Sequence, residues 1–123
     1  MITGAVNSNL EAIVRLLVNG IDGNSVEIEA AVDTGFTGSL TLPTDMVSSL
    51  GLPWLGREQG ILGDGRLGLF DIYAATVAWN ENDRIVDTVA AGAQPLIGMG
   101  LVHGHELSIQ AVEGGAVRIE ALA

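Results

Sequence analysis

Apolar and polar residues alternate along much of the chain, which is the pattern of β-strands that bury one face. In residues 25–32 the even positions are apolar, and they alternate with Glu27 and Glu29. An apolar, β-branched run at residues 11–18 precedes this segment, and the residues between the two runs favour a turn with positive φ. The pattern therefore predicts a β-hairpin whose second strand ends just before Asp33.

The later apolar runs are short, and turn-forming residues separate them. Asp64-Gly65 between two apolar runs is a strong hairpin signal, and Gly51 is suited to end a helix in the left-handed conformation. We predict further strands at residues 40–42, 58–62, 67–79, 84–90, 96–97, 106–112 and 116–122, and short helices at residues 45–50 and 98–102. Turns at this spacing predict an all-β fold, a small closed β-barrel with one or two short helices.

The composition is that of a globular protein, and we expect residues 1–123 to form a single domain. Hydrophobic residues make up 48% of the chain, which is enough for a core, and only 16% of the residues are charged. The 17 glycines favour tight turns over long helices. Because the chain has no cysteine, disulfide bonds, thiolate metal sites and cysteine catalysis are excluded.

The chain is strongly acidic, because 15 acidic residues face only 5 basic ones, all of them arginine, and the formal charge is −10. Such a charge disfavours binding to nucleic acid and to anionic membranes. We interpret it as a solubilising surface, and the attraction of basic peptides is the alternative. No apolar run is long enough to span a bilayer and no signal peptide is evident, so we expect a cytoplasmic protein.

One motif carries candidate chemistry, Asp33-Thr34-Gly35, and it follows the strand predicted at residues 25–32. An aspartate before a glycine often only begins a turn, so the tripeptide alone is weakly specific. Its context is more specific, since Thr-Gly-Ser-Leu-Thr-Leu-Pro follows, then a glycine-tipped hairpin, and later Leu96-Ile97-Gly98. In this order the three elements resemble the retropepsin-like single-domain aspartic proteases of clan AA, particularly their small prokaryotic branch.

This resemblance implies an acid-protease barrel and an aspartic endopeptidase that acts as a homodimer on a peptide or protein substrate. Only one Asp-Thr-Gly is present, so Asp33 would act together with its symmetry copy in a partner chain. Two carboxylates that share a water cannot both ionise readily. The ionised one would act as a base on the water, and the protonated one would donate a hydrogen bond to the scissile carbonyl. Such a reaction requires no metal and no cofactor.

The same resemblance implies supporting roles for other residues. The Thr34 hydroxyl would cross the dimer axis, and the Gly35 amide would point at a carboxylate oxygen of Asp33. The glycine-tipped hairpin would be a flap that closes over the substrate. The residues expected to bind substrate, in the flap and in a pocket, are Phe36, Ile61, Leu62, Gly63, Asp64, Gly65 and Ile97.

The sequence departs from the family pattern at two places. Phe36 stands where the family usually has a small residue, and its side chain cannot donate a hydrogen bond to Asp33. Gly98 is followed by Met99 rather than by the arginine that ties retroviral dimers together. The dimer would then be held differently, for example by pairing of residues 116–122 across chains.

Two further motifs are rejected. The stretch from Gly63 to Gly68 matches the GxGxxG pattern of nucleotide-binding loops, but a strand rather than a helix is predicted after it. His103 and His105 have no obvious further ligand set, so no metal site is predicted.

Two alternatives to the protease remain. One is a catalytically silent peptide-binding or dimerisation module with the same fold, because a fold does not establish an activity. The other is a monomeric β-barrel binding domain in which Asp33 is only a turn residue.

Overall fold

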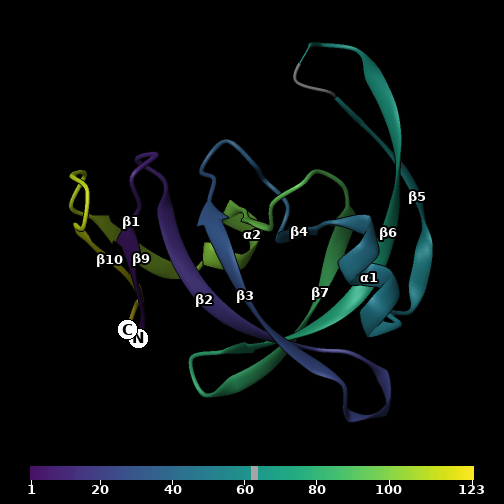
Figure 1. Cartoon of the computed structure of the whole chain (residues 1–123), viewed down its shortest axis with the longest axis horizontal. Coiled ribbons are helices and arrows are strands. Elements are labelled where there is room, and N and C mark those ends of the chain that lie inside the picture. The colour runs from purple at the N-terminus through teal and green to yellow at the C-terminus, as the bar shows by residue number, and fades with distance from the viewer. Residues whose placement is uncertain (62–63) are drawn as a thin grey trace.

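The structure is a computed structural model that describes residues 1–61 and 64–123, and most of these residues lie in β-strands (Figure 1). The strands are β1 Ile2–Val6, β2 Ala12–Asn19, β3 Ser25–Val32, β4 Leu40–Leu42, β5 Trp54–Ile61, β6 Leu67–Trp79, β7 Asn82–Ala90, β8 Leu96–Ile97, β9 His105–Ile109 and β10 Ala116–Ala121. The helices are α1 Thr44–Leu50 and α2 Met99–Val102, with a 3₁₀ turn at Ile21–Gly23. None of the helices in these two segments is long and apolar enough to cross a membrane.

The strands form a sheet that closes on itself. Its order is β5-β6-β7-β4-β8-β3-β2-β1-β10-β9, and an additional pairing between β2 and β6 closes the ring. The barrel therefore consists of β6, β7, β4, β8, β3 and β2, and the strands β1, β10 and β9 extend the sheet to one side (Figure 1). This arrangement, with α1 and α2 as short helices, confirms the small closed β-barrel predicted from the sequence.

The β2–β3 hairpin forms as its alternating pattern predicts. Leu16 lies opposite Ile28, and both side chains are buried in the core. The next pair, Arg15 and Glu29, points to the other face of the sheet, where the two side chains are exposed and bonded to each other at 3.2 Å. The second strand ends at the residue before Asp33, as predicted.

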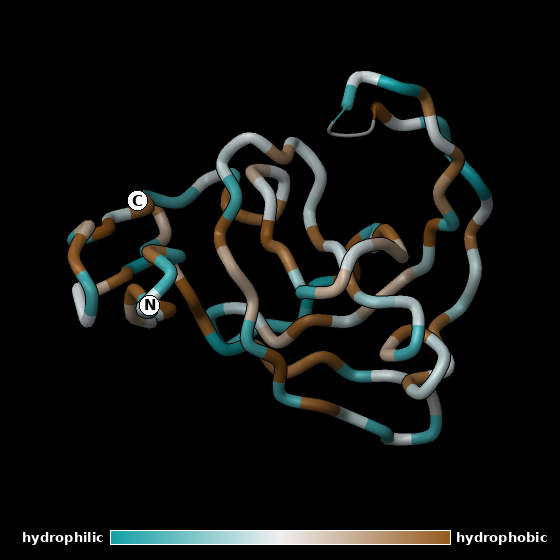
Figure 2. Tube along the Cα trace, turned by 45° about the horizontal axis from the view of Figure 1, so that its top comes forward, coloured by the Kyte–Doolittle hydropathy of each residue, from teal (hydrophilic) through white to brown (hydrophobic). Residues whose placement is uncertain are grey.

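The core fills the barrel with aliphatic side chains. Figure 2 shows hydrophobic and hydrophilic positions alternating along the strands. The large aliphatic side chains that are almost completely buried are Leu40, Leu42, Ile97, Leu101, Ile119, Val14, Val18, Val77 and Val117. Because burying one such side chain contributes about 1.5–3 kcal/mol, this set is the main source of the stability of the barrel.

The largest departures from the predicted strands are at β1, β5 and β9. The pattern predicts no strand at Ile2–Val6, which nevertheless pairs with both β2 and β10. Strand β5 begins at Trp54 rather than at residue 58, because a bulge with φ 148° at Gly56 lets the pairing with β6 continue past it. Strand β9 ends at Ile109 rather than at residue 112, since the chain then turns so tightly that a Cβ on Gly115 would lie 1.8 Å from a backbone oxygen.

The expected pairing of residues 116–122 across two chains is wrong. Strand β10 lies between β1 and β9, and it is hydrogen-bonded to both. Both of its edges are therefore occupied within one chain. The two edges of the sheet, over the residues described, are β5 and β9.

Backbone hydrogen bonds fasten the loop after β3 to the first turn of α2. The amides of Gly98 and Met99 donate to the carbonyl oxygens of Ser39 at 3.0 Å and Phe36 at 2.7 Å. A Cβ on Gly98 would lie only 2.1 Å from the carbonyl oxygen of Gly38. The two segments can approach this closely only because Gly98 has no side chain.

We expect Gly98→Ala to destabilise the protein, because the added methyl group would push the loop after β3 away from α2. The free energy of unfolding should fall by about 2 kcal/mol or more, as in other overpacked sites. The free energy of unfolding is measured by urea denaturation, with circular dichroism as the signal.

The matched control is Gly114→Ala, where a Cβ meets open space and only the positive φ of 79° is unfavourable. This control should cost about 1 kcal/mol. Equal losses in the two variants would show that the contact at Gly98 carries no special strain.

Candidate active site

Asp33 follows β3 where this strand lies beside β8, and backbone hydrogen bonds fix its position. Its amide donates to the carbonyl oxygen of Ile97 at 2.8 Å, and its own carbonyl oxygen accepts from the Phe36 amide at 3.1 Å. The Gly35 amide donates to the Asp33 carboxylate oxygen Oδ1 at 2.9 Å, the geometry expected for this loop. The other oxygen, Oδ2, accepts no hydrogen bond from the residues described. The loop therefore presents one oriented and partly exposed carboxylate.

Two clefts adjoin the Asp33 loop. The first, which we call the Phe36 cleft, has a volume of about 660 Å³ and is lined by Gly35, Phe36, Gly60, Ile61, Phe70 and Ile72 among other residues. The second, the Leu10 cleft, has a volume of about 540 Å³, and its lining includes Leu10, Glu11, Asp33, Thr34, Ile109 and Ala111. The loop thus borders one cleft with Gly35 and Phe36 and the other with Asp33 and Thr34.

The hairpin of β5 and β6 forms one wall of the Phe36 cleft. Figure 1 shows it rising beyond the barrel and curving back above the side where the loop after β3 lies. Glu58 pairs with Phe70, and Glu58, Gly60 and Phe70 all line the cleft. A Cβ on Gly60 would lie 2.8 Å from the Phe70 ring, so this ring rests directly on the glycine.

Phe36, the departure from the family pattern, packs against glycines. A Cβ on Gly38 would lie 2.5 Å from the Phe36 ring, and a Cβ on Gly98 would lie equally close, at 2.5 Å. The aromatic ring therefore occupies space that these two glycines leave open. Its remaining surface lines the Phe36 cleft and adds an apolar floor to it.

The rim of the Leu10 cleft is a hydrogen-bonded loop that exposes a leucine. Leu10 has φ 60°, an unfavourable conformation for this residue, and its side chain is 70% exposed. The Asn7 side chain holds the loop, since its Oδ1 accepts from the amides of Asn9 at 3.0 Å and Glu11 at 2.9 Å. A strained backbone that presents an apolar side chain to water points to a functional rather than a structural role.

The structure places five of the ten predicted site residues in the Asp33 loop or in the lining of an adjoining cleft. Asp33, Thr34 and Gly35 lie in one loop, and Phe36 and Ile61 line the same cleft. Asp64 and Gly65 are exposed near the end of the hairpin and do not line the Phe36 cleft. Leu62 and Gly63 lie outside the described residues.

Ile97 is a correction to the predicted pocket. Its side chain is 0% exposed and belongs to the core beneath the Asp33 loop. It therefore supports the loop from below and does not reach either cleft.

Sequence reasoning misses Leu10, Glu58 and Phe70. The signal for Glu58 and Phe70 is their equal spacing from the hairpin turn, which places them opposite each other on one face once the register is set. Leu10 gives no such signal, because its backbone conformation is set by the side chain of Asn7.

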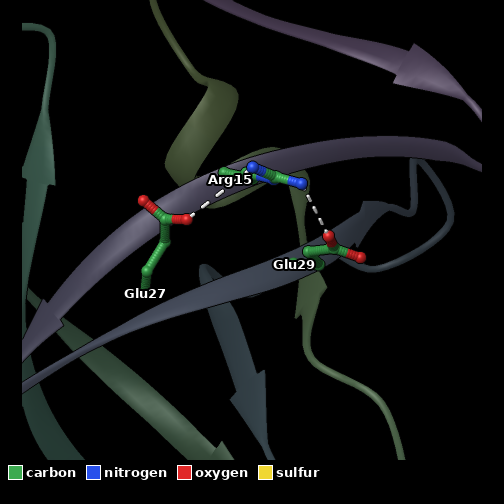
Figure 3. Close-up of polar contacts among 3 residues, drawn as sticks. All are labelled: Arg15, Glu27 and Glu29. Carbon is green, nitrogen blue, oxygen red and sulfur yellow. Dashed lines mark hydrogen bonds and ion pairs between the residues drawn. The ribbon is translucent and has the colours of Figure 1, made fainter.

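The charges at the two clefts are acidic. Glu58 is the charged residue in the lining of the Phe36 cleft, and Glu11 and Asp33 are those in the lining of the Leu10 cleft. Most arginines already have partners elsewhere. Arg15 lies between Glu27 and Glu29 (Figure 3), Arg57 bonds Asp71, Arg66 bonds Asp64, and Arg84 donates to the backbone of α2.

One ion pair fastens the base of the hairpin on its outer face. Arg57 Nε donates to Asp71 Oδ1 at 3.0 Å, and Trp54 Nε1 donates to the same oxygen at 3.1 Å. The hydrogen bond from Arg57, reinforced by that from Trp54, holds the pKa of Asp71 below its ordinary value.

The histidines are engaged in the fold. His105 Nε2 accepts from Trp79 Nε1 at 3.0 Å, and its Nδ1 lies 3.0 Å from the carbonyl oxygen of His103. This arrangement fits a neutral ring with the proton on Nδ1. Over residues 1–61 and 64–123 no group of three or more histidine, cysteine or carboxylate side chains could hold a metal ion.

Comparison with known proteins supports the fold. No protein-family model matches the chain, and no curated protein sequence matches it. Among solved structures, the fold is similar to that of a retropepsin-like aspartic protease from Rickettsia conorii, with a TM-score of 0.59 and 15% identity over 98% of this chain and 91% of that one. At this identity the likeness concerns the fold, and it confirms the retropepsin-like barrel predicted from the Asp33 motif.

We expect Arg57→Gln to raise the pKa of Asp71 toward its ordinary value, because the variant loses the charge and the donor that favour the carboxylate. The pair stabilises the fold above the pKa of Asp71 in the unfolded chain. Its contribution is lost as the pH falls through the lower pKa of the folded state. Carboxyl chemical shifts recorded by NMR during a pH titration measure the change.

Arg66→Gln, which breaks a different exposed pair, is the control and should leave Asp71 unchanged. A pKa of Asp71 that stays the same in Arg57→Gln would contradict the assignment.

Proposed function

We propose that the protein is an aspartic endopeptidase that acts as a homodimer, with Asp33 and its symmetry copy activating the water. The observation that carries this proposal is the Asp33 loop. One carboxylate, held by the Gly35 amide at 2.9 Å, belongs to a loop that borders an apolar cleft through Gly35 and Phe36 in a retropepsin-like barrel. A chain of this fold with one such loop supplies half of a two-carboxylate site.

The chemistry follows from two aspartates that share one proton. The ionised Asp33 removes a proton from the water, which attacks the scissile carbonyl. The protonated copy donates a hydrogen bond to the carbonyl oxygen. The proton then passes to the leaving amine, and the two carboxylates exchange roles. The Gly35 amide keeps its Asp33 in the orientation that this exchange requires.

The Phe36 cleft is proposed to bind the peptide in an extended conformation. Its lining is mainly apolar, with Phe36, Phe70, Ile72 and Val89, and it lies beneath the β5–β6 hairpin. Strand β5 is an edge of the sheet, so its backbone is available to pair with a peptide as an added strand. Side chains of the peptide would then alternate between the cleft and the solvent.

The Leu10 cleft is proposed to be covered by the partner chain. Asp33 and Thr34 both line it, so a second chain seated there would bring its own Asp33 to the same place. The exposed side chains of Leu10 and Ile109 at this cleft give that contact an apolar rim. The Thr34 hydroxyl is exposed on the same side, where it could bond across the axis.

Cleavage of a peptide library tests the proposal directly. We expect the wild-type protein to cleave a subset of the library, and Asp33→Asn to lower kcat/KM by at least about 100-fold, because the amide can neither share the proton nor act as a base. Mass spectrometry of the products measures cleavage.

Asp45→Asn, a change at an exposed carboxylate in α1, is the control and should keep wild-type activity. Activity that survives Asp33→Asn would remove this residue from the mechanism. Peptide binding without any cleavage would favour the silent peptide-binding module instead.

The dimer is tested at Leu10. We expect Leu10→Asp to raise the dissociation constant of the dimer at least about tenfold and to lower activity in parallel, because a charge would be buried at the contact. Sedimentation velocity over a range of protein concentrations measures it.

Ile85→Asp is the matched control, since Ile85 is 77% exposed on β7 and lines neither cleft. A wild-type protein that remains monomeric at high concentration would overturn the dimer. An unchanged dimer in Leu10→Asp would place the contact elsewhere.

A further inference from the structure

The Phe36 cleft adjoins a smaller cleft at the base of the hairpin. This smaller cleft has a volume of about 130 Å³ and is lined by Leu55, Gly56, Arg57, Glu58, Ile72 and Asp87. Glu58 and Ile72 line both clefts. The two clefts therefore adjoin at these residues, so the smaller one is a candidate extension of the Phe36 cleft.

Two carboxylates flank this extension from opposite sides. Glu58 pairs with Phe70 across the β5–β6 ladder, and Asp87 pairs with Ala74 across the β6–β7 ladder. Phe70, Ile72 and Ala74 alternate on one face of β6, so Glu58 and Asp87 lie on that same face with Ile72 between them. The apolar cleft thus ends between two acidic side chains.

These carboxylates have no cation partner among the residues described. The salt bridges found there do not involve Glu58 or Asp87. Arg57 also lines the smaller cleft, but its guanidinium bonds Asp71, whose position in the register belongs to the opposite face of the hairpin. The chain has no lysine that could take its place.

We propose that this site selects peptides with an arginine or lysine side chain, and that Glu58, together with Asp87, determines this specificity. The inference rests on the proposed function, because it assigns a preference to the same peptide cleft. The aliphatic part of the basic side chain lies along Ile72 and Leu55. Its cationic end lies between the two carboxylates, where a neutral side chain of the same shape forms only the weaker, uncharged hydrogen bonds.

The charge of the whole chain acts in the same direction. A formal charge of −10 attracts basic peptides to the protein. This general attraction acts over the whole acidic surface and not only at the cleft. The cleft would hold the basic side chain at one defined place, because it combines an apolar groove with two carboxylates at one end. Selection should therefore be confined to one position of the peptide, whereas general attraction is the same at every position.

The experiment compares arginine with citrulline, its neutral analogue of nearly the same shape. Eight pools of fluorescein-labelled octapeptides of random apolar sequence carry one arginine, each at a different position, and eight matched pools carry citrulline. Binding to Asp33→Asn is measured by fluorescence anisotropy, and cleavage by the wild-type protein is measured on the same pools.

We expect a preference for arginine of up to about tenfold at one position, because Glu58 and Asp87 are both exposed and each exposed charge contact contributes little. The preference should weaken as salt is added. It should be largely lost in the double variant Glu58→Gln/Asp87→Asn, tested in the same Asp33→Asn background for binding.

The control variant also removes two negative charges, but at a site outside the clefts. Glu106 and Glu120 are exposed and lie opposite each other on β9 and β10, outside both clefts. Glu106→Gln/Glu120→Gln should keep the preference for arginine at that position.

The outcomes separate the two proposals. Cleavage without a preference for arginine overturns the specificity and leaves the protease. Selective binding that depends on Glu58 and Asp87, without cleavage of any pool, supports the specificity and overturns the protease. An equal loss of preference in the control variant, or a preference at every position, shows general attraction and overturns the inference.

Discussion

The structure of the candidate site depends on the close contact between two segments of backbone. The loop that carries Asp33 rests on the first turn of α2, and the two are joined by hydrogen bonds from the amides of Gly98 and Met99. Gly98 permits the approach because it has no side chain, and the ring of Phe36 fills the space beside it. A hydrophobic core alone would not orient a carboxylate, since burial has no preferred direction. Hydrogen bonds at fixed positions supply that orientation.

The barrel explains why this contact forms. Strands β3 and β8 lie parallel and adjacent, so the segments that follow them emerge at the same end. One segment becomes the Asp33 loop and the other becomes α2. Ile97, the last residue of β8, is completely buried beneath them and ties the loop to the core. Residues that are distant in the sequence thus meet through the order of the strands.

Local patterns were sufficient for much of the fold. The predicted bounds are correct for β3, β4, β6 and β8. In these strands the apolar residues and the neighbouring turn residues define where the strand begins and ends. Strand β1 depends instead on pairing with β10, at the other end of the chain, and nothing in its own five residues indicates this. The early start of β5 likewise depends on the bulge at Gly56, which a pattern with a period of two does not reveal.

The residues of the candidate site also fall into those that local sequence reveals and those that only the folded chain reveals. Asp33 and the glycines around it are recognisable because this motif and the elements that follow it resemble those of a known family. Ile97 is wrongly expected in the pocket, since an aliphatic residue beside a glycine has the same sequence signature in a core as in a cleft. Glu58 and Leu10 depend on register and on loop geometry, which follow only from the assembled chain.

The bulge at Gly56 has a consequence for the length of chain that the edge strand can accept. Regular pairing between β5 and β6 runs from Gly56 to Ile61, and the register shifts before it. A bulge bends the strand and increases its twist, so an extended chain cannot follow the edge of β5 through this point. Regular pairing with another strand is therefore possible only along the short part of β5 that follows the bulge. Bulged edges are one way in which natural sheets limit the long, flat pairing between molecules that leads to aggregation.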